Sequence, residues 1–206
     1  VVCKQYADGG LKMINVRSFI STLKLSWLRR LIPDSDWKAF TVNMYPEMGN
    51  IENFGAEYID IIMKNVKNLF WKDVFKHMKN LFTKCIPNNA HEFLAEHIQY
   101  NANILRDKKT IYVKEWHDYN IFLIRQLLNL DGKFFTFNEF LIKYPGIKTN
   151  FLLYEGILNA IKGYQHRLNI ILTCKYSLIN NIVWQCIKKG NKYIQQILNN
   201  NLDTPT

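Results

Sequence analysis

The stretch VRSFISTLKLSWLRRLI, residues 16–32, carries the clearest helical pattern in the sequence. A helix brings every third or fourth residue onto one face, and one face of this stretch is apolar. The apolar face consists of Val16, Ile20, Leu23, Trp27 and Leu31. It is widened by Leu25, Leu28 and Ile32. The opposite face carries Ser18, Thr22 and Arg29. We therefore expect a helix over residues 16–32 that packs on more than one side and stops at Pro33.

Further periodic segments predict a mainly α fold. The other expected helices span residues 37–44, 70–85, 119–130, 137–144 and 150–163, with two more within 168–199 separated by Gly190. Thr136 and Glu139 form a capping-box pattern, and Thr149 is expected to cap the helix over 150–163. Residues 45–53 are expected to form a loop and residues 110–113 a short strand. The predicted fold is an irregular multi-helix bundle with at most one short β hairpin or strand pair.

Length and composition favour one globular domain. The chain has 206 residues, of which 48% are hydrophobic, and this share excludes a disordered chain. We expect a single helical domain over 1–206, with a possible subdivision into 1–105 and 106–206. No apolar run is long enough to cross a membrane. The chain begins with Val1 rather than Met and shows no secretion signal, so we expect a non-secreted fragment of a larger polypeptide.

The sequence contains no pattern typical of an enzyme, a metal site or a cofactor site. Its four cysteines and five histidines form no closely spaced ligand pairs. Tyr6-Ala7-Asp8-Gly9 resembles a polymerase metal turn, but a second carboxylate is missing. The segment after Asp131-Gly132 fails as a calcium loop, because oxygen ligands are missing at its first and last positions. No phosphate-binding glycine loop occurs. We expect a non-catalytic protein without a cofactor.

Positive charge is concentrated near the amino terminus. The formal net charge is +10, and residues 1–32 hold six cations and one anion. A helix with an apolar face can pack against a core and still present cations to phosphate groups. The expected contacts to a nucleic-acid backbone are Lys12, Arg17, Lys24, Arg29 and Arg30. The alternative is a solvated basic face that keeps the protein soluble. A second, smaller basic patch, with the same two interpretations, consists of Lys188, Lys189 and Lys192.

A spaced pattern of glycines and aromatic residues resembles one known family. It begins with Asp8-Gly9-Gly10-Leu11-Lys12-Met13 and continues with Phe19, Leu23-Lys24, Trp27-Leu28-Arg29-Arg30, Phe70-Trp71-Lys72-Asp73-Val74-Phe75, Tyr100-Asn101, Trp116, Gly132-Lys133-Phe134, Asn150-Phe151-Leu152 and Gly156-Ile157. This pattern is similar to the region after the palm and thumb of LINE-type non-LTR retrotransposon reverse transcriptases. Asn120 stands where that family often has glycine.

The resemblance implies a helical, wrist-like and non-catalytic region of a larger RNA-directed DNA polymerase. Its implied partners are the template–primer RNA or RNA/DNA and the remainder of the reverse transcriptase, with no membrane. The implied location is a ribonucleoprotein in cytoplasm and nucleus. Trp27, Trp71, Phe75 and Trp116 are assigned to packing, since aromatic residues at helical spacing usually form a core.

Three alternatives stay open beside backbone binding. The chain can be a structural module that buttresses the thumb, or a degenerate transposon fragment without activity. It can also be an unrelated basic helical domain that binds a small acidic ligand. A closed pocket lined by Arg or Lys would favour this last interpretation.

Overall fold

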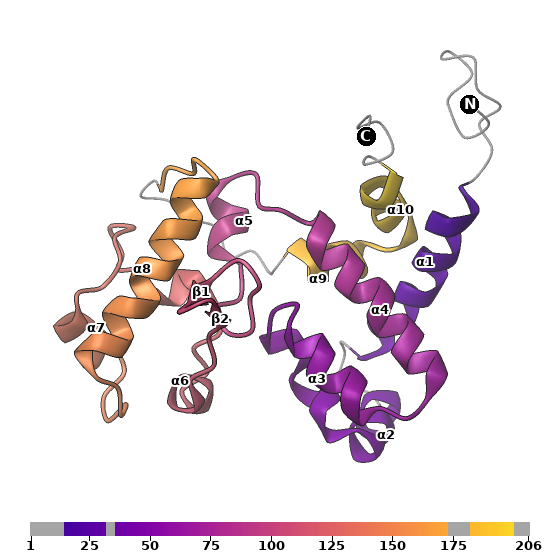
Figure 1. Ribbon diagram of the computed structural model, residues 1–206, viewed down its shortest axis with the longest axis horizontal. Helices are drawn as coiled ribbons and strands as arrows, with labels where there is room; N and C mark the ends of the chain where they lie inside the picture. The colour runs from indigo at the N-terminus through magenta and orange to yellow at the C-terminus, as the bar shows by residue number, and fades with distance from the viewer. Residues whose placement is uncertain (1–14, 32–35, 173–181, 200–206) are drawn as a thin grey trace, which may run out of the picture.

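The computed structural model describes residues 15–31, 36–172 and 182–199. The described chain is mainly α-helical with one two-stranded antiparallel hairpin, so the predicted fold class is confirmed. Figure 1 shows the helices gathered into two lobes, and each lobe has its own hydrophobic core. Residues 1–14, which include Lys12 and the glycine-rich opening, lie outside the described residues.

The first lobe combines helices from both ends of the described chain. It contains α1 (Val16–Ser26), the 3₁₀ helix η2 (Trp27–Leu31), α2 (Asp36–Met44), the 3₁₀ helix η3 (Pro46–Asn53), α3 (Tyr58–Asn65), α4 (Leu69–Lys84), α9 (Ile182–Lys189) and α10 (Asn191–Asn199). Its core includes Leu25, Leu28, Ile62, Phe75, Met78 and Ile187. The two tail helices are separated by Gly190, as predicted, and Gly190 has a positive φ of 101°. Glycine adopts this backbone conformation without steric cost.

The second lobe is built from the middle of the chain. It contains α5 (Ala90–Leu94), β1 (Leu105–Arg106), β2 (Lys109–Thr110), α6 (Lys114–Asp118), the 3₁₀ helix η4 (Ile124–Leu127), α7 (Phe137–Lys143) and α8 (Phe151–Arg167). Its core surrounds Trp116, Phe140 and Tyr154. The predicted capping box of Thr136 and Glu139 is confirmed at the start of α7. Asn150, not Thr149, caps α8. The subdivision at residue 105 stays a prediction.

The packing face predicted for residues 16–32 is right in its second half, where Leu25, Leu28 and Leu31 are buried, and wrong in its first half. Val16, Ile20 and Leu23 are 65%, 43% and 45% exposed, whereas the buried residues of α1 are Ser18, Ser21, Thr22 and Leu25. Small polar side chains allow close packing against α4 and α10, and their hydroxyls find partners there or within the helix. Ser21 Oγ lies 2.9 Å from His77 Nδ1, and Thr22 Oγ1 donates to the Ser18 carbonyl at 2.7 Å. The segment also changes from α to 3₁₀ geometry at Trp27.

Three other local predictions are wrong. Residues 45–53 contain the 3₁₀ helix η3 instead of a loop. Of the strand expected over 110–113, only Thr110 is paired. The helix expected over 119–130 is reduced to the four residues of η4, because Asn120 has a φ of 56°. The backbone that follows Asn120 bonds to the segment after α5, where Ile98 N donates to Phe122 O at 2.8 Å.

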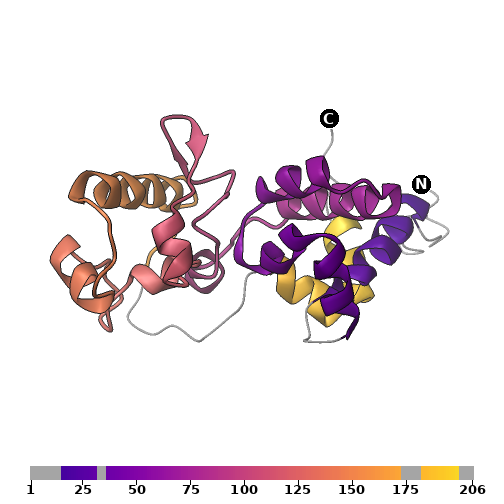
Figure 2. The same cartoon turned by 90° about the horizontal axis from the view of Figure 1, so that it is seen from below.

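The two lobes meet along a junction formed by η3, the start of α3 and residues 96–101. Gly55 N donates to Gln99 O at 2.9 Å, and Glu57 N donates to Tyr100 O at 3.0 Å. Figure 2 shows the two lobes side by side. Phe54 fills the junction, with its ring centroid 4.4 Å from that of Tyr58 and 5.2 Å from that of Tyr100. This junction fixes how the lobes are oriented.

Replacing Gly55 with alanine is expected to weaken the junction. A Cβ atom at Gly55 would lie 2.6 Å from Tyr100 O and 2.8 Å from Asn101 Cα, and backbone atoms cannot move aside cheaply. We expect the free energy of unfolding to fall by about 1–3 kcal/mol, measured by urea denaturation. Gly163→Ala is the control, because a Cβ there meets nothing within 4 Å and helix α8 gains up to ~1 kcal/mol. Equal stability of the two variants would contradict this account.

A buried histidine at the junction makes stability depend on pH. Burial lowers the pKa of His97 from 6.5 to about 4, and His97 Nε2 donates to the Glu52 carbonyl at 2.9 Å. As the pH falls below 6.5, the unfolded chain takes up a proton that the folded chain excludes until about pH 4. The free energy of unfolding should therefore fall by about 2 kcal/mol between pH 7 and pH 5.

Urea denaturation across this pH range tests the assignment to His97. His97→Gln keeps a donor for the Glu52 carbonyl but cannot be protonated, so it should flatten the pH dependence. His166→Gln changes an exposed histidine of α8 and should retain the wild-type slope. The assignment fails if both variants retain that slope.

Candidate nucleic-acid interface

A seam of basic residues runs along the contact between α1 and α4. We define the basic seam as Arg17 and Lys24 of α1 together with Lys72 and Lys76 of α4. Arg17, Ser21 and Lys24 lie on one side of α1, because they are spaced by four and three residues. The bond between Ser21 and His77 joins this side to α4. The fold thus brings the predicted cation Lys24 near Lys76 of α4, since the charges of both act on His77.

The charges of Lys24 and Lys76 both act on His77, which lies where α4 contacts α1. Its pKa is lowered first by burial and then by the charges of Lys24 and Lys76. Asp73 lies one turn away, with Oδ1 3.6 Å from His77 Nε2, and its negative charge does not reverse this shift. A positive potential of this kind attracts phosphate groups, although salt screens it at the surface.

The predicted contact residues have unequal surroundings. Arg17 is exposed on α1. Lys24 forms an ion pair with Asp73, yet its side chain is still 30% exposed. Arg29 is held by α10, since its Nη2 donates to Asn191 Oδ1 at 3.0 Å. The Arg30 guanidinium lies 4.2 Å from the centre of the Trp27 ring, a cation–π arrangement. The four predicted contact residues that the structure describes therefore lie on α1 and η2, but they differ in exposure and in the groups that they contact.

A row of partly exposed aromatic rings includes the ring of this cation–π pair. We define the aromatic row as Phe40, Trp37, Trp27 and Phe70, which come from α2, η2 and α4. Successive ring centroids are 6.2, 6.2 and 5.3 Å apart. Phe40, Trp37 and Phe70 are 58%, 39% and 43% exposed. Of the aromatic residues assigned to packing, Trp71, Phe75 and Trp116 are buried, and Trp27 is half-buried.

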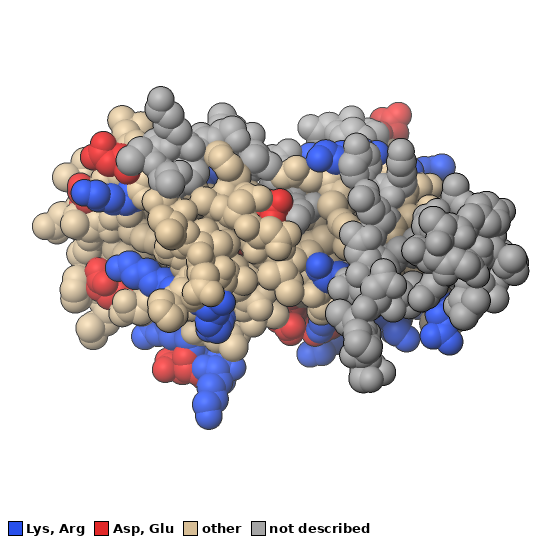
Figure 3. Space-filling model, turned by 90° about the horizontal axis from the view of Figure 1, so that it is seen from above, with Lys and Arg blue, Asp and Glu red and all other residues tan. Residues whose placement is uncertain are grey.

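Positive charge also lies elsewhere on the surface. Figure 3 shows Lys and Arg spread over both lobes, with neutral side chains filling most of the face between them. Lys188 and Lys189 are exposed on α9, and the side chain of Lys192 lies outside the described residues. In the first lobe, the Arg30 guanidinium lies over Trp27, so a cation lies beside the partly exposed rings of the aromatic row. Phosphate backbones and unstacked bases require this combination.

Part of the interface could have been found from sequence. Lys72 and Lys76 are four residues apart on the helix predicted over 70–85, so one helical face carries both. Trp37 and Phe40 lie three residues apart on a short helix, a spacing that gives no sign of exposure. Their position next to Trp27 depends on tertiary packing.

Comparisons with known proteins do not place this chain in a family. No protein-family model, curated protein or solved structure matches it. In the described part of the chain, no helix has both the length and the apolar character needed to cross a membrane. The same part contains no group of three or more His, Cys, Asp or Glu side chains arranged to hold a metal ion.

Proposed function

We propose that this chain is a non-catalytic helical region of a non-LTR retrotransposon reverse transcriptase that contacts the phosphate backbone of its template–primer. The origin rests on the resemblance of the spaced glycines and aromatic residues. The contact rests chiefly on the exposed cations Arg17 and Lys76 and on Arg30, which lies over Trp27 in the aromatic row. Backbone contacts suit such a region, because a polymerase must hold templates of any sequence.

The aromatic row favours single-stranded over double-stranded nucleic acid. Bases in a duplex are stacked on one another and offer no free ring face, whereas unpaired bases stack on exposed aromatic side chains. Arg30 covers Trp27, so a cation lies within the row itself. We infer that the basic seam holds phosphates while the aromatic row receives unpaired bases of the template.

A second candidate function is a module that buttresses the thumb. Two of the predicted contact cations support this alternative, because Lys24 pairs with Asp73 and Arg29 bonds to Asn191. Both contacts hold helices of the first lobe together without any ligand. Binding to RNA separates the two candidates, since a buttress needs no affinity for phosphate.

Binding to mixed-sequence single-stranded RNA should depend on salt through the basic seam. We expect a negative slope of log K against log salt concentration, with a contribution of roughly −0.7 for each contacted phosphate. Arg17→Ala combined with Lys76→Ala should reduce the magnitude of this slope by about 1.4. Fluorescence anisotropy of labelled RNA over a salt series measures it.

The matched control removes two cations from the second lobe. Lys143→Ala combined with Lys162→Ala changes the net charge equally, and both lysines are exposed. It should leave the slope nearly unchanged. Equal losses in both double variants would mean that only net charge matters, and undetectable binding at low salt would favour the buttress.

Removing rings from the aromatic row should lower affinity for single-stranded RNA selectively. Stacking of one base contributes about 1–3 kcal/mol, so Trp37→Ala or Phe40→Ala should weaken binding about fivefold or more. Binding to double-stranded RNA should not change. Phe151→Ala serves as the control, because Phe151 is similarly exposed on α8 of the second lobe. A parallel loss for both forms of RNA would refute the role of the row.

A further inference from the structure

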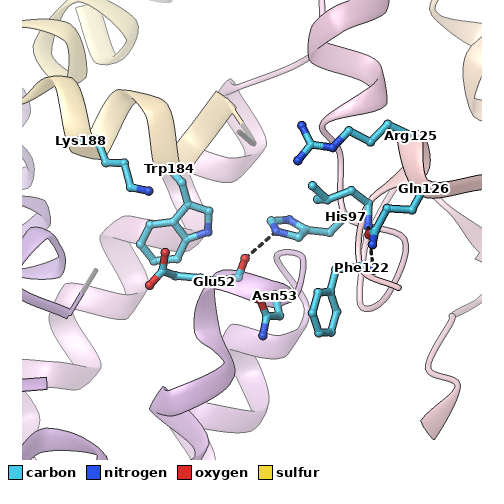
Figure 4. Close-up of a pocket in the computed structure, with 9 residues that line it drawn as sticks. Glu52, Asn53, His97, Phe122, Arg125, Gln126, Trp184 and Lys188 are labelled. Atoms are coloured by element: carbon cyan, nitrogen blue, oxygen red, sulfur yellow. Dashed lines mark hydrogen bonds between the residues drawn. The ribbon is translucent and has the colours of Figure 1, made fainter. Parts of the chain in front are cut away.

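A cavity of about 330 Å³ lies at the junction, outside the basic seam. Its walls come from the end of η3, from His97, from residues around η4 and from α9. Figure 4 shows Trp184 and Lys188 on one side and Arg125 and Gln126 on the other, with His97 between them. The volume lies at the lower end of the range for small-molecule sites.

Two buried side chains of this wall carry a polar atom without a hydrogen-bond partner among the described residues. They are His97 Nδ1 and Trp184 Nε1. His97 and Trp184 are 1% and 3% exposed, and the indole nitrogen points across the cavity toward His97 in Figure 4. Buried polar atoms are rarely unpaired, because burial removes their hydrogen bonds to water and an unpaired atom gains nothing in exchange. A polar ligand in this cavity would therefore supply the hydrogen-bond partners that His97 Nδ1 and Trp184 Nε1 lack in the described part of the chain.

The chemistry of these two atoms specifies what that ligand must offer. The Glu52 carbonyl can only accept, so the proton of neutral His97 resides on Nε2 and Nδ1 is an acceptor. Trp184 Nε1–H can only donate. A ligand that satisfies both must carry one hydrogen-bond donor and one acceptor. The edges of nucleobases present such donors and acceptors side by side.

The charges of the wall favour an anion. Arg125 and Lys188 contribute two cations, and Glu52 contributes one carboxylate. Glu52 Oε1 lies 3.8 Å from Lys38 Nζ, so its charge is partly balanced outside the cavity. Burial lowers the pKa of Arg125, as expected where a cation has lost part of its hydration. A bound anion would add favourable charge interactions with both Arg125 and Lys188.

Besides the polar side chains of Asn53 and Gln126, the wall has an apolar part, formed by the rings of Phe122 and Trp184 and the side chain of Leu123. Inorganic phosphate would meet the cations but would leave these surfaces uncovered. We propose that the junction pocket binds a mononucleotide, with its phosphate toward Arg125 and Lys188 and its base against the buried donor and acceptor. This site is independent of the proposed backbone contact, because the two share no residue.

Calorimetric titration of the full chain with adenosine 5′-monophosphate tests this assignment. Trp184→Phe removes the indole N–H but keeps a ring, and it should weaken binding about fivefold to tenfold. Trp116→Phe is the matched control, because Trp116 Nε1 is also buried without a partner among the described residues but lies in the core of the second lobe. Lys188→Ala should weaken binding about tenfold, whereas Lys189→Ala, one position along α9 and outside the wall, should not.

Three results would overturn the proposal. They are undetectable binding of the mononucleotide, equal affinity for inorganic phosphate alone, and unchanged affinity in Trp184→Phe. Adenosine should bind more weakly than the monophosphate, because it lacks the anion. These outcomes are independent of RNA binding at the basic seam, which the salt-slope measurement reports separately.

Discussion

The close approach of two backbones at the lobe junction is the constraint on which the rest of the structure depends. Gly55 leaves room for the segment at Tyr100 and Asn101, and two backbone hydrogen bonds join the segments there. Two separate hydrophobic cores would otherwise be linked only by connecting chain. The junction pocket takes walls from both lobes, so it exists only while this contact holds. Interfaces between packed units are common places for ligand sites.

The cations of the first lobe divide into two groups by what they contact. Lys24 and Arg29 bond to other helices, and such contacts orient elements whether or not a ligand is bound. Arg17 and Lys76 are exposed, and Lys76 still affects the pKa of a neighbouring histidine. A side chain with a structural partner must give up part of that contact to bind phosphate, so its net contribution to binding is smaller. The exposed pair therefore carries most of the proposed attraction.

Periodicity alone predicted most of the helices but not how they pack. The helices over 37–44, 70–85 and 137–144 appear close to their expected bounds, because caps and breakers are local signals. The first half of α1 packs through a different face from the expected one, since close contact with α4 favours small side chains such as Ser21 over larger apolar ones. The helix expected over residues 119–130 does not form beyond Asn120, because the backbone there pairs with residues near His97. Tertiary hydrogen bonds of this kind leave no local pattern.

The pocket could not have been predicted, because its walls come from residues near positions 52, 97, 122–126 and 184–188. From the sequence alone, binding of a small acidic ligand is only a general alternative, whereas the fold forms a specific pocket for one. His97 links this place to stability. The burial that lowers its pKa to about 4 also keeps Nδ1 unprotonated at neutral pH, and therefore able to accept a hydrogen bond. Protonation would remove the acceptor and bury a charge at the contact that joins the lobes. Both the pocket and the junction therefore depend on His97 remaining neutral.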